Sequence, residues 1–162
     1  PEMGIASINP GKAIMWAYIA TSISDFSSGW FSHILKSRKK AILYMLLLTL
    51  VGVIMMLFSG KKTENMYYFY CFWIGFGSGF WAMLVTVAAE QFGTNLRSTA
   101  TTSVPNMIRG SVPIMLIAFD YLKQTRSVII SAAIVGAIAF AMGIYATLTI
   151  SETHNREMDF VE

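Results

Sequence analysis

Residues 90–110, EQFGTNLRSTATTSVPNMIRG, decide how the rest of the chain is interpreted. This stretch leaves one strongly apolar segment, crosses a short polar loop and enters a second apolar segment that contains Arg109. A charged side chain inside a membrane span costs about 2.5–3.5 kcal/mol on insertion scales, so it rarely occurs there without a structural or functional reason. The stretch therefore predicts two membrane helices joined by a loop, the second of which faces more than lipid.

The composition indicates a membrane protein rather than a soluble domain. Of the 162 residues, 55% are hydrophobic and 13% are charged, whereas a soluble domain carries about 25% charged residues. The single cysteine, Cys71, lies in an apolar run and is interpreted as a small hydrophobic residue. The chain begins with Pro1 rather than Met and shows no signal-peptide pattern, so we expect it to be a piece of a longer protein.

Five apolar segments predict an all-α fold, a polytopic membrane helical bundle with five transmembrane helices. The predicted spans are about 11–35, 41–58, 66–89, 100–122 and 128–150, followed by a polar tail at 151–162. A dense basic cluster, residues 36–40 (KSRKK), separates the first two spans, and the positive-inside rule places it in the cytoplasm. Five spans then place the C-terminal tail in the cytoplasm as well. We expect a multi-pass protein of the plasma or inner membrane.

Two of the five segments carry a polar stripe at helical spacing. In the first segment the stripe consists of Tyr18, Thr21, Ser22, Asp25, Ser28, Gly29 and Ser32. In the fourth it consists of Thr99, Thr102, Asn106, Arg109 and Pro113. Such a helix turns its stripe toward protein or a wet cavity and its apolar side toward lipid. Pro105 and Pro113 also predict kinks in the fourth segment.

The other three segments carry no charged residue. The second segment is apolar on nearly every side, so we expect it at the lipid-facing periphery. The third contains Gly75 and Gly79, a small-xxx-small pair that favours close helix packing more than ligand binding.

Taken in order, these segments resemble the last five helices of a major facilitator superfamily transporter. Residues 90–97 (EQFGTNLR) are similar to the loop between the tenth and eleventh helices of the sugar-porter and metabolite–proton symporter branches. Residues 29–40 (GWFSHILKSRKK) resemble the glycine–acid–basic motif that follows the eighth helix. His33 stands where the acid is usual, and the nearest acid, Asp25, precedes Gly29. The resemblance implies that the N-terminal half of the transporter is missing and that this chain supplies one wall of a site near the bilayer midplane.

The resemblance and the stripes together predict secondary active transport of a small polar solute, anionic solutes included, by alternating access. The residues expected to bind solute or line the cavity are Arg109, Asn106, Thr102, Asp25, Ser22 and Tyr18. The residues expected to latch helix ends in one conformational state are Gly29, Arg38, Lys39, Glu90 and Arg97. An exposed ion pair contributes only about 0–1 kcal/mol, which suits a latch that must open. The expected partners are the solute, the lipid bilayer, the missing half and a coupling proton.

Arg109 and Asp25 each allow two roles. Arg109 can bind an anionic group of the solute, oriented by Asn106, or it can be a gating arginine paired with a group in the missing half. Asp25 can carry the coupling proton, but a structural link to the basic loop is the preferred interpretation. Both residues lie near the middle of their spans. A direct contact between them is not expected, because the resemblance implies that each of their helices faces a helix of the missing half.

Two other function classes were weighed against transport. An enzyme would need a nucleophile–base pair or a metal cluster within the spans, and His33 and His154 lie near helix ends without a carboxylate at ligand spacing. We therefore expect no enzymatic activity, no cofactor and no nucleic-acid partner. The alternative that stays open is an accessory or structural multi-span membrane protein without transport activity, although such a protein gains nothing from an arginine inside a span.

Overall fold

The structure, a computed structural model, describes residues 8–59 and 63–154. Within these ranges it is helical and contains no strand. The helices are α1 (Pro10–Leu35), α2 (Arg38–Phe58), α3 (Glu64–Ser78), α4 (Trp81–Gln91), α5 (Arg97–Lys123) and α6 (Val128–Thr149). The all-α prediction is confirmed, and each predicted segment coincides with helical structure.

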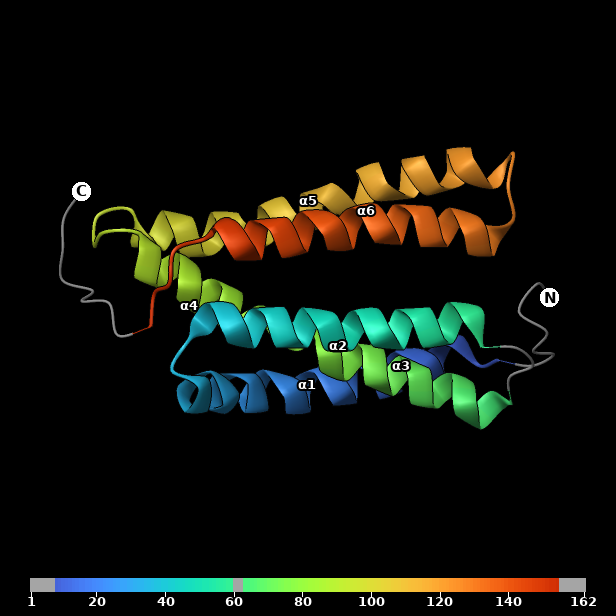
Figure 1. Ribbon diagram of the computed structural model, residues 1–162, viewed down its shortest axis with the longest axis horizontal. Coiled ribbons are helices and arrows are strands. Elements are labelled where there is room, and N and C mark those ends of the chain that lie inside the picture. The colour runs from blue at the N-terminus through green and yellow to red at the C-terminus, as the bar shows by residue number, and fades with distance from the viewer. Residues whose placement is uncertain (1–7, 60–62, 155–162) are drawn as a thin grey trace.

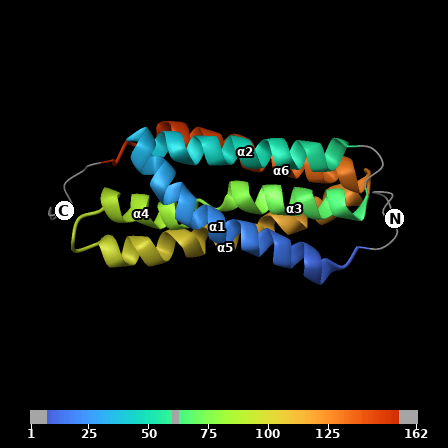
Figure 2. The same ribbon diagram turned by 90° about the horizontal axis from the view of Figure 1, so that it is seen from below.

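The helices run back and forth along the long axis of the molecule (Figure 1). α1, α2, the α3–α4 pair, α5 and α6 cross it in alternating directions. The α1–α2 connection, the α4–α5 connection and residues 150–154, which follow α6, therefore gather at one end, here termed the basic end because it contains residues 36–40. α1 packs mainly on α3, α4 packs mainly on α5, and α2 joins the α1–α3 pair to α6 (Figure 2).

Polar side chains in the sequence fix where several helices begin. Asn9 Oδ1 accepts a hydrogen bond from the N–H of Gly11 at 2.9 Å and so caps α1. Ser37 Oγ accepts one from the N–H of Lys40 at 3.1 Å and caps α2. Between the two helices, Lys36 adopts a left-handed conformation with φ 49° and ends α1. These local signals keep the connection at the basic end short.

The third predicted span is interrupted, contrary to the prediction of one helix over 66–89. α3 ends at Ser78 and α4 begins at Trp81. A Cβ added to Gly75 would lie 2.3 Å from the carbonyl oxygen of Ala17, and one added to Gly79 would lie 2.2 Å from the Cβ of Ser24. The predicted close packing of the glycines is thus confirmed. Glycine has a low helix propensity, so the residues that let α3 approach α1 also weaken the helix at this point.

The polar residues of α1 lie on two faces of the helix and not on the single stripe that the sequence predicts. Ser24, Ser28 and Ser32, spaced by four residues, are fully buried and form a packing face. Tyr18 and Ser22, from the same predicted stripe, are exposed on another face. The apolar residues expected to face lipid do lie on the outside of the bundle: Ile14, Met15, Ile19, Ile23, Phe26 and Trp30.

Helix α2 is not peripheral on all sides, so that expectation is wrong in part. Ala41, Ile42 and Met45 are buried, whereas Val51 and Ile54 on the other side are exposed. Uniform apolarity does not distinguish protein contact from lipid contact, because both surroundings are apolar. The hydrophobic core lies near the basic end and consists of Ala41, Ile42, Met83 and Val87, covered by Phe31, Leu35, Phe80, Leu84 and Ile150.

Three stretches of the described chain are long and apolar enough to cross a membrane: α2, the α3–α4 pair and α6. Their mean hydropathy is 2.7, 1.6 and 2.3. α1 and α5 are longer than 18 residues but do not join this group, since polar and charged side chains interrupt them. α5 is a single helix that contains both Pro105 and Pro113.

Candidate functional site

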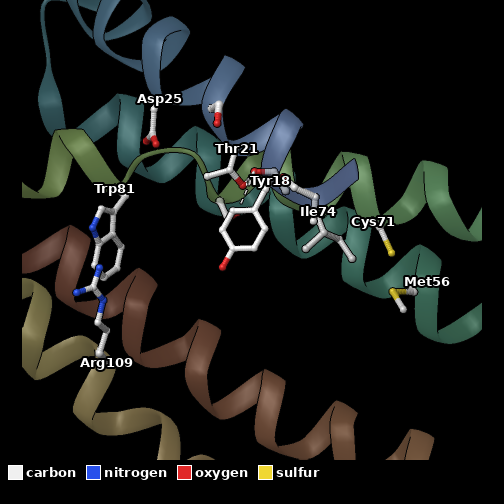
Figure 3. Close-up of a pocket in the computed structure, with 12 residues that line it drawn as sticks. Tyr18, Thr21, Asp25, Met56, Cys71, Ile74, Trp81 and Arg109 are labelled. Carbon is white, nitrogen blue, oxygen red and sulfur yellow. Dashed lines mark hydrogen bonds between the residues drawn. The ribbon is translucent and has the colours of Figure 1, made fainter. Parts of the chain in front are cut away.

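A cavity of about 780 Å³ lies beside the middle of α1, where α3 gives way to α4 (Figure 3). Ligand sites commonly measure about 300–1,000 Å³, so a small solute fits within it. Five helices line the cavity, through Ala17, Tyr18, Thr21, Ser22, Asp25, Met56, Cys71, Ile74, Gly75, Ser78, Trp81 and Arg109. Four of the six residues predicted from the sequence to line such a cavity are among them: Tyr18, Ser22, Asp25 and Arg109.

The wall formed by α1 and α3 is built on a close backbone approach. The hydroxyl of Thr21 donates to the carbonyl oxygen of Ala17 at 2.9 Å and to that of Gly75 at 3.1 Å. Thr21 thus satisfies its donor within the wall, and the neighbouring positions Tyr18 and Ser22 are exposed and line the cavity.

Arg109 enters the cavity from α5 and is the one cationic residue in its lining. Its guanidinium carbon lies 5.3 Å from the centroid of the Trp81 ring, within the range of a cation–π contact. Within residues 8–59 and 63–154 the guanidinium takes part in no hydrogen bond and no ion pair. Its five N–H donors are thus available to a bound group.

Asp25 lies on the other side of the start of α4 (Figure 3). Its Oδ1 accepts a hydrogen bond from the backbone N–H of Ala82 at 3.4 Å. Phe80, at the N-cap of α4, provides no side-chain cap, so the carboxylate from α1 lies where the helix N-terminus favours negative charge. Asp25 and Arg109 form no ion pair in the described structure, as expected. The expected link from Asp25 to the basic loop is replaced by this link to α4.

Thr102 and Asn106 do not line the cavity. The Thr102 hydroxyl donates to the carbonyl oxygen of Ser98 at 2.6 Å, and Asn106 is exposed on α5. Thr102 lies seven residues before Arg109, about 10 Å along the helix axis. Only part of the polar stripe of α5 therefore lines the cavity.

A second cluster, at the basic end, pairs its charges. Arg38 Nη2 lies 2.9 Å from Glu90 Oε1, and the two side chains are 14% and 8% exposed. Arg38 Nη1 donates to Ser32 Oγ at 3.0 Å, and the Thr153 hydroxyl donates to Glu90 Oε2 at 2.6 Å. These contacts join α1, α2, α4 and the segment after α6, and together with Glu152 their residues are termed the basic-end network.

Glu152 connects the same segment to the start of α2. Its carboxylate accepts hydrogen bonds from the Ser37 hydroxyl and, at 2.8 Å, from the N–H of Arg38. The N–H groups of Thr153 and His154 donate to it at 3.1 and 3.2 Å. Burial raises the pKa of Glu152, but these hydrogen bonds outweigh burial, so its pKa lies below the usual 4.5.

The remaining predicted latch residues have different surroundings. Lys39 Nζ donates to the carbonyl oxygens of Leu148 and Ile150 at the end of α6. Arg97 Nε donates to the carbonyl oxygen of Ala89 at 3.0 Å. A Cβ added to Gly29 would meet nothing within 4 Å, so this glycine serves no close packing here.

No group of three or more His, Cys, Asp or Glu side chains in the described ranges is arranged to hold a metal ion. Neither a protein-family model nor a curated protein nor a solved structure matches this chain.

Sequence reasoning missed Trp81 as a cavity residue and Glu152 and Thr153 as members of the network. The signal for Trp81 was the glycine-rich stretch before it, which was interpreted only as a packing face. The sequence predicts a polar tail at 151–162, and polar composition alone does not indicate docking. Glu152 contacts Ser37, 115 positions away, and Thr153 contacts Glu90, 63 positions away, and helical periodicity within one segment does not predict contacts between segments.

Proposed function

We propose that this chain is part of a secondary transporter that moves a small anionic solute through the cavity by alternating access. One observation carries the proposal. Arg109 lies near the middle of the 27-residue α5, lines the cavity and has no hydrogen-bonding partner in the described structure. An unpaired cation at this depth in a membrane is costly, so a ligand that neutralises it is strongly favoured.

The rest of the cavity suits a small solute with further polar groups. Tyr18, Ser22 and Ser78 contribute hydroxyls to its lining, and Ile74 and Met56 contribute apolar surface. Few polar groups placed in an otherwise apolar pocket are typical of small-molecule sites. Arg109 would hold the anionic group, while the hydroxyls on the α1 side would hold the remainder of the solute.

The proposed membrane topology extends the three apolar stretches to five spans. α1 and α5 would cross the bilayer with their polar sides toward the cavity, as in the C-terminal part of a major facilitator superfamily transporter. The exposed apolar side of α1, with Phe26 and Trp30, supports this orientation. The basic end would lie in the cytoplasm, and the other half of the same transporter would close the cavity.

The basic-end network is proposed as the cytoplasmic latch. It joins four segments that an opening motion must separate, and its ion pair between Arg38 and Glu90 is largely shielded from water. Lys39 adds contacts to the end of α6. Such a latch stabilises one state and opens when another state gains more from bound solute.

Transport by the full-length protein in proteoliposomes tests the proposal. Uptake would be measured for radiolabelled carboxylates, inorganic phosphate, neutral sugars and amino acids. Arg109→Gln should weaken uptake of the anionic substrate about 10- to 100-fold, because it removes charge-assisted hydrogen bonds. Lys123→Gln, at an exposed residue far along the same helix, is the matched control.

Unchanged affinity for an anionic solute in Arg109→Gln would overturn the role of Arg109. Transport restricted to neutral solutes would overturn the solute class. If none of these solutes is transported, the accessory membrane protein becomes the better interpretation.

A further inference from the structure

Trp81 occupies an unusual place in the cavity wall. It is the first residue of α4, directly after the interruption at Gly79 and Phe80, and it is partly buried. Its ring lies beside the Arg109 guanidinium, 5.3 Å from centroid to carbon (Figure 3). In the described chain the Arg109 side chain forms no hydrogen bond or ion pair that would compete with this contact.

The chemistry of this contact leaves Arg109 free to bind. A cation–π contact uses the face of the Trp81 ring and no oxygen or nitrogen acceptor, and the Arg109 N–H groups have no hydrogen-bond partner in the described structure. Two parallel N–H groups match two oxygens of a carboxylate or a phosphate. Restricting the long side chain in this way also lowers the rotamer freedom that binding would otherwise remove.

The start of α4, where Trp81 lies, also contacts α1. Phe80 does not cap α4 through its side chain, and Asp25 accepts a hydrogen bond at 3.4 Å from Ala82, the residue next to Trp81. The first turn of α4 therefore lies between the two opposite charges of the cavity, Asp25 and Arg109, which form no ion pair in the described structure.

We infer that Trp81 is a positioning residue that holds the Arg109 guanidinium ready for an oxyanion, either a carboxylate or a phosphate. The inference rests on the proposed function, because it concerns the same cavity. It adds the chemical class of the bound group and assigns a role to Trp81.

The first experiment needs no ligand and tests the contact alone. Tryptophan emission of the purified full-length protein would be compared before and after Arg109→Gln, in the wild type and in Trp81→Phe. We expect Arg109→Gln to shift the emission of the wild type and to leave that of Trp81→Phe unchanged. An equal shift in both, or no shift in either, overturns the positioning role whatever the protein transports.

The second experiment measures binding of succinate and of inorganic phosphate by calorimetry. Trp81→Leu should weaken binding about tenfold and Trp81→Phe about threefold, because phenylalanine keeps a ring face. Trp30→Phe, at an outward-facing residue that is 72% exposed, should bind as the wild type does. Tighter binding of succinate assigns the site to carboxylates, and tighter binding of phosphate assigns it to phosphate.

A double variant separates positioning from direct contact with solute. In the Arg109→Gln background, Trp81→Leu should have no further effect, since the residue acts through Arg109. Additive effects would overturn the positioning role and leave the proposed function intact. If Arg109→Gln binds both anions as the wild type does, or if neither anion binds the wild type, the proposed anion site fails, and the emission experiment still decides whether Trp81 contacts Arg109.

Discussion

Arg38 and Arg109 carry the same side chain in contrasting surroundings. Arg38 has a carboxylate partner, Glu90, and a hydroxyl partner, Ser32, and little of its side chain is exposed. Arg109 has an aromatic ring beside it and an open cavity in front of it. The ion pair of Arg38 stabilises helix ends, whereas the guanidinium of Arg109 has N–H groups that a ligand can bind. The hydrogen-bonding partners of the two arginines therefore distinguish a structural residue from a candidate ligand-binding residue.

The two regions also hold their helices together in different ways. The basic-end network joins four segments through side chains. At the cavity, α1 and α3 are joined by backbone contact at glycines, with Thr21 bridging to Gly75. Side-chain links can break and reform without disturbing a helix, while a glycine contact fixes the wall. The difference agrees with the proposal that the cavity wall is fixed and that the basic-end network is a latch.

The largest expected effect is that of Arg38→Gln. It leaves Glu90, which is 7% exposed, without its cationic partner. The free energy of unfolding should therefore fall by about 3 kcal/mol. Thermal unfolding in detergent, followed by circular dichroism, measures the loss. Asp120→Asn is the control, because it breaks an exposed pair with Lys123 and should cost at most about 1 kcal/mol. Equal losses would remove the distinction between the two ends.

Gly75→Ala should have the next largest effect. The new Cβ would lie 2.3 Å from the carbonyl oxygen of Ala17, so α1 and α3 must separate, at a cost of about 1–3 kcal/mol. Gly29→Ala, which meets nothing within 4 Å, should instead stabilise α1 by about 0.5–1 kcal/mol. The same unfolding measurement serves both. Tolerance of alanine at Gly75 would show that the cavity wall does not depend on this contact.

The effect of acid on Glu152 should be smaller. Its pKa is lower in the folded protein than the usual 4.5, so its hydrogen bonds stabilise the docked segment above that pH. This stabilisation is lost as pH falls through the lowered pKa of the folded state. Protection of the Thr153 and His154 amides against hydrogen exchange, referenced to intrinsic rates, should fall there. In Glu152→Gln the protection should be weaker and independent of pH in this range; a pH-dependent loss in that variant would point to another group.

Arg109→Gln should have the smallest effect on stability. Within the described chain its guanidinium forms no hydrogen bond or ion pair, and its cation–π contact with Trp81, at an exposed site, is worth about 0.5–1 kcal/mol. Thermal unfolding without solute should therefore match the wild type closely. A loss as large as that of Arg38→Gln would favour the gating interpretation, in which Arg109 has a protein partner.

Several features of the cavity were accessible from the sequence. Helical spacing of polar residues predicted that Tyr18, Ser22, Asp25 and Arg109 lie away from the apolar side of their helices, and all four line the cavity. The same spacing could not tell that Thr102 lies beyond the reach of the cavity. It also merged Ser28 and Ser32 with the cavity face of α1, although they are buried in the packing face. Helical periodicity shows which face of a helix a residue occupies, but it does not show which other helix or cavity lies against that face.

The sequence by itself determined where five helical segments lie, because each is an apolar run bounded by polar connections, but it did not show the interruption between Ser78 and Trp81. It also identified Arg109 as a charged residue within an apolar segment, which indicates a structural or functional role. Only the tertiary structure decided that Arg38 has a carboxylate partner while Arg109 does not, and that Asp25 meets the start of α4. Pairings between distant segments depend on how whole helices pack, and a local pattern contains no information about that packing.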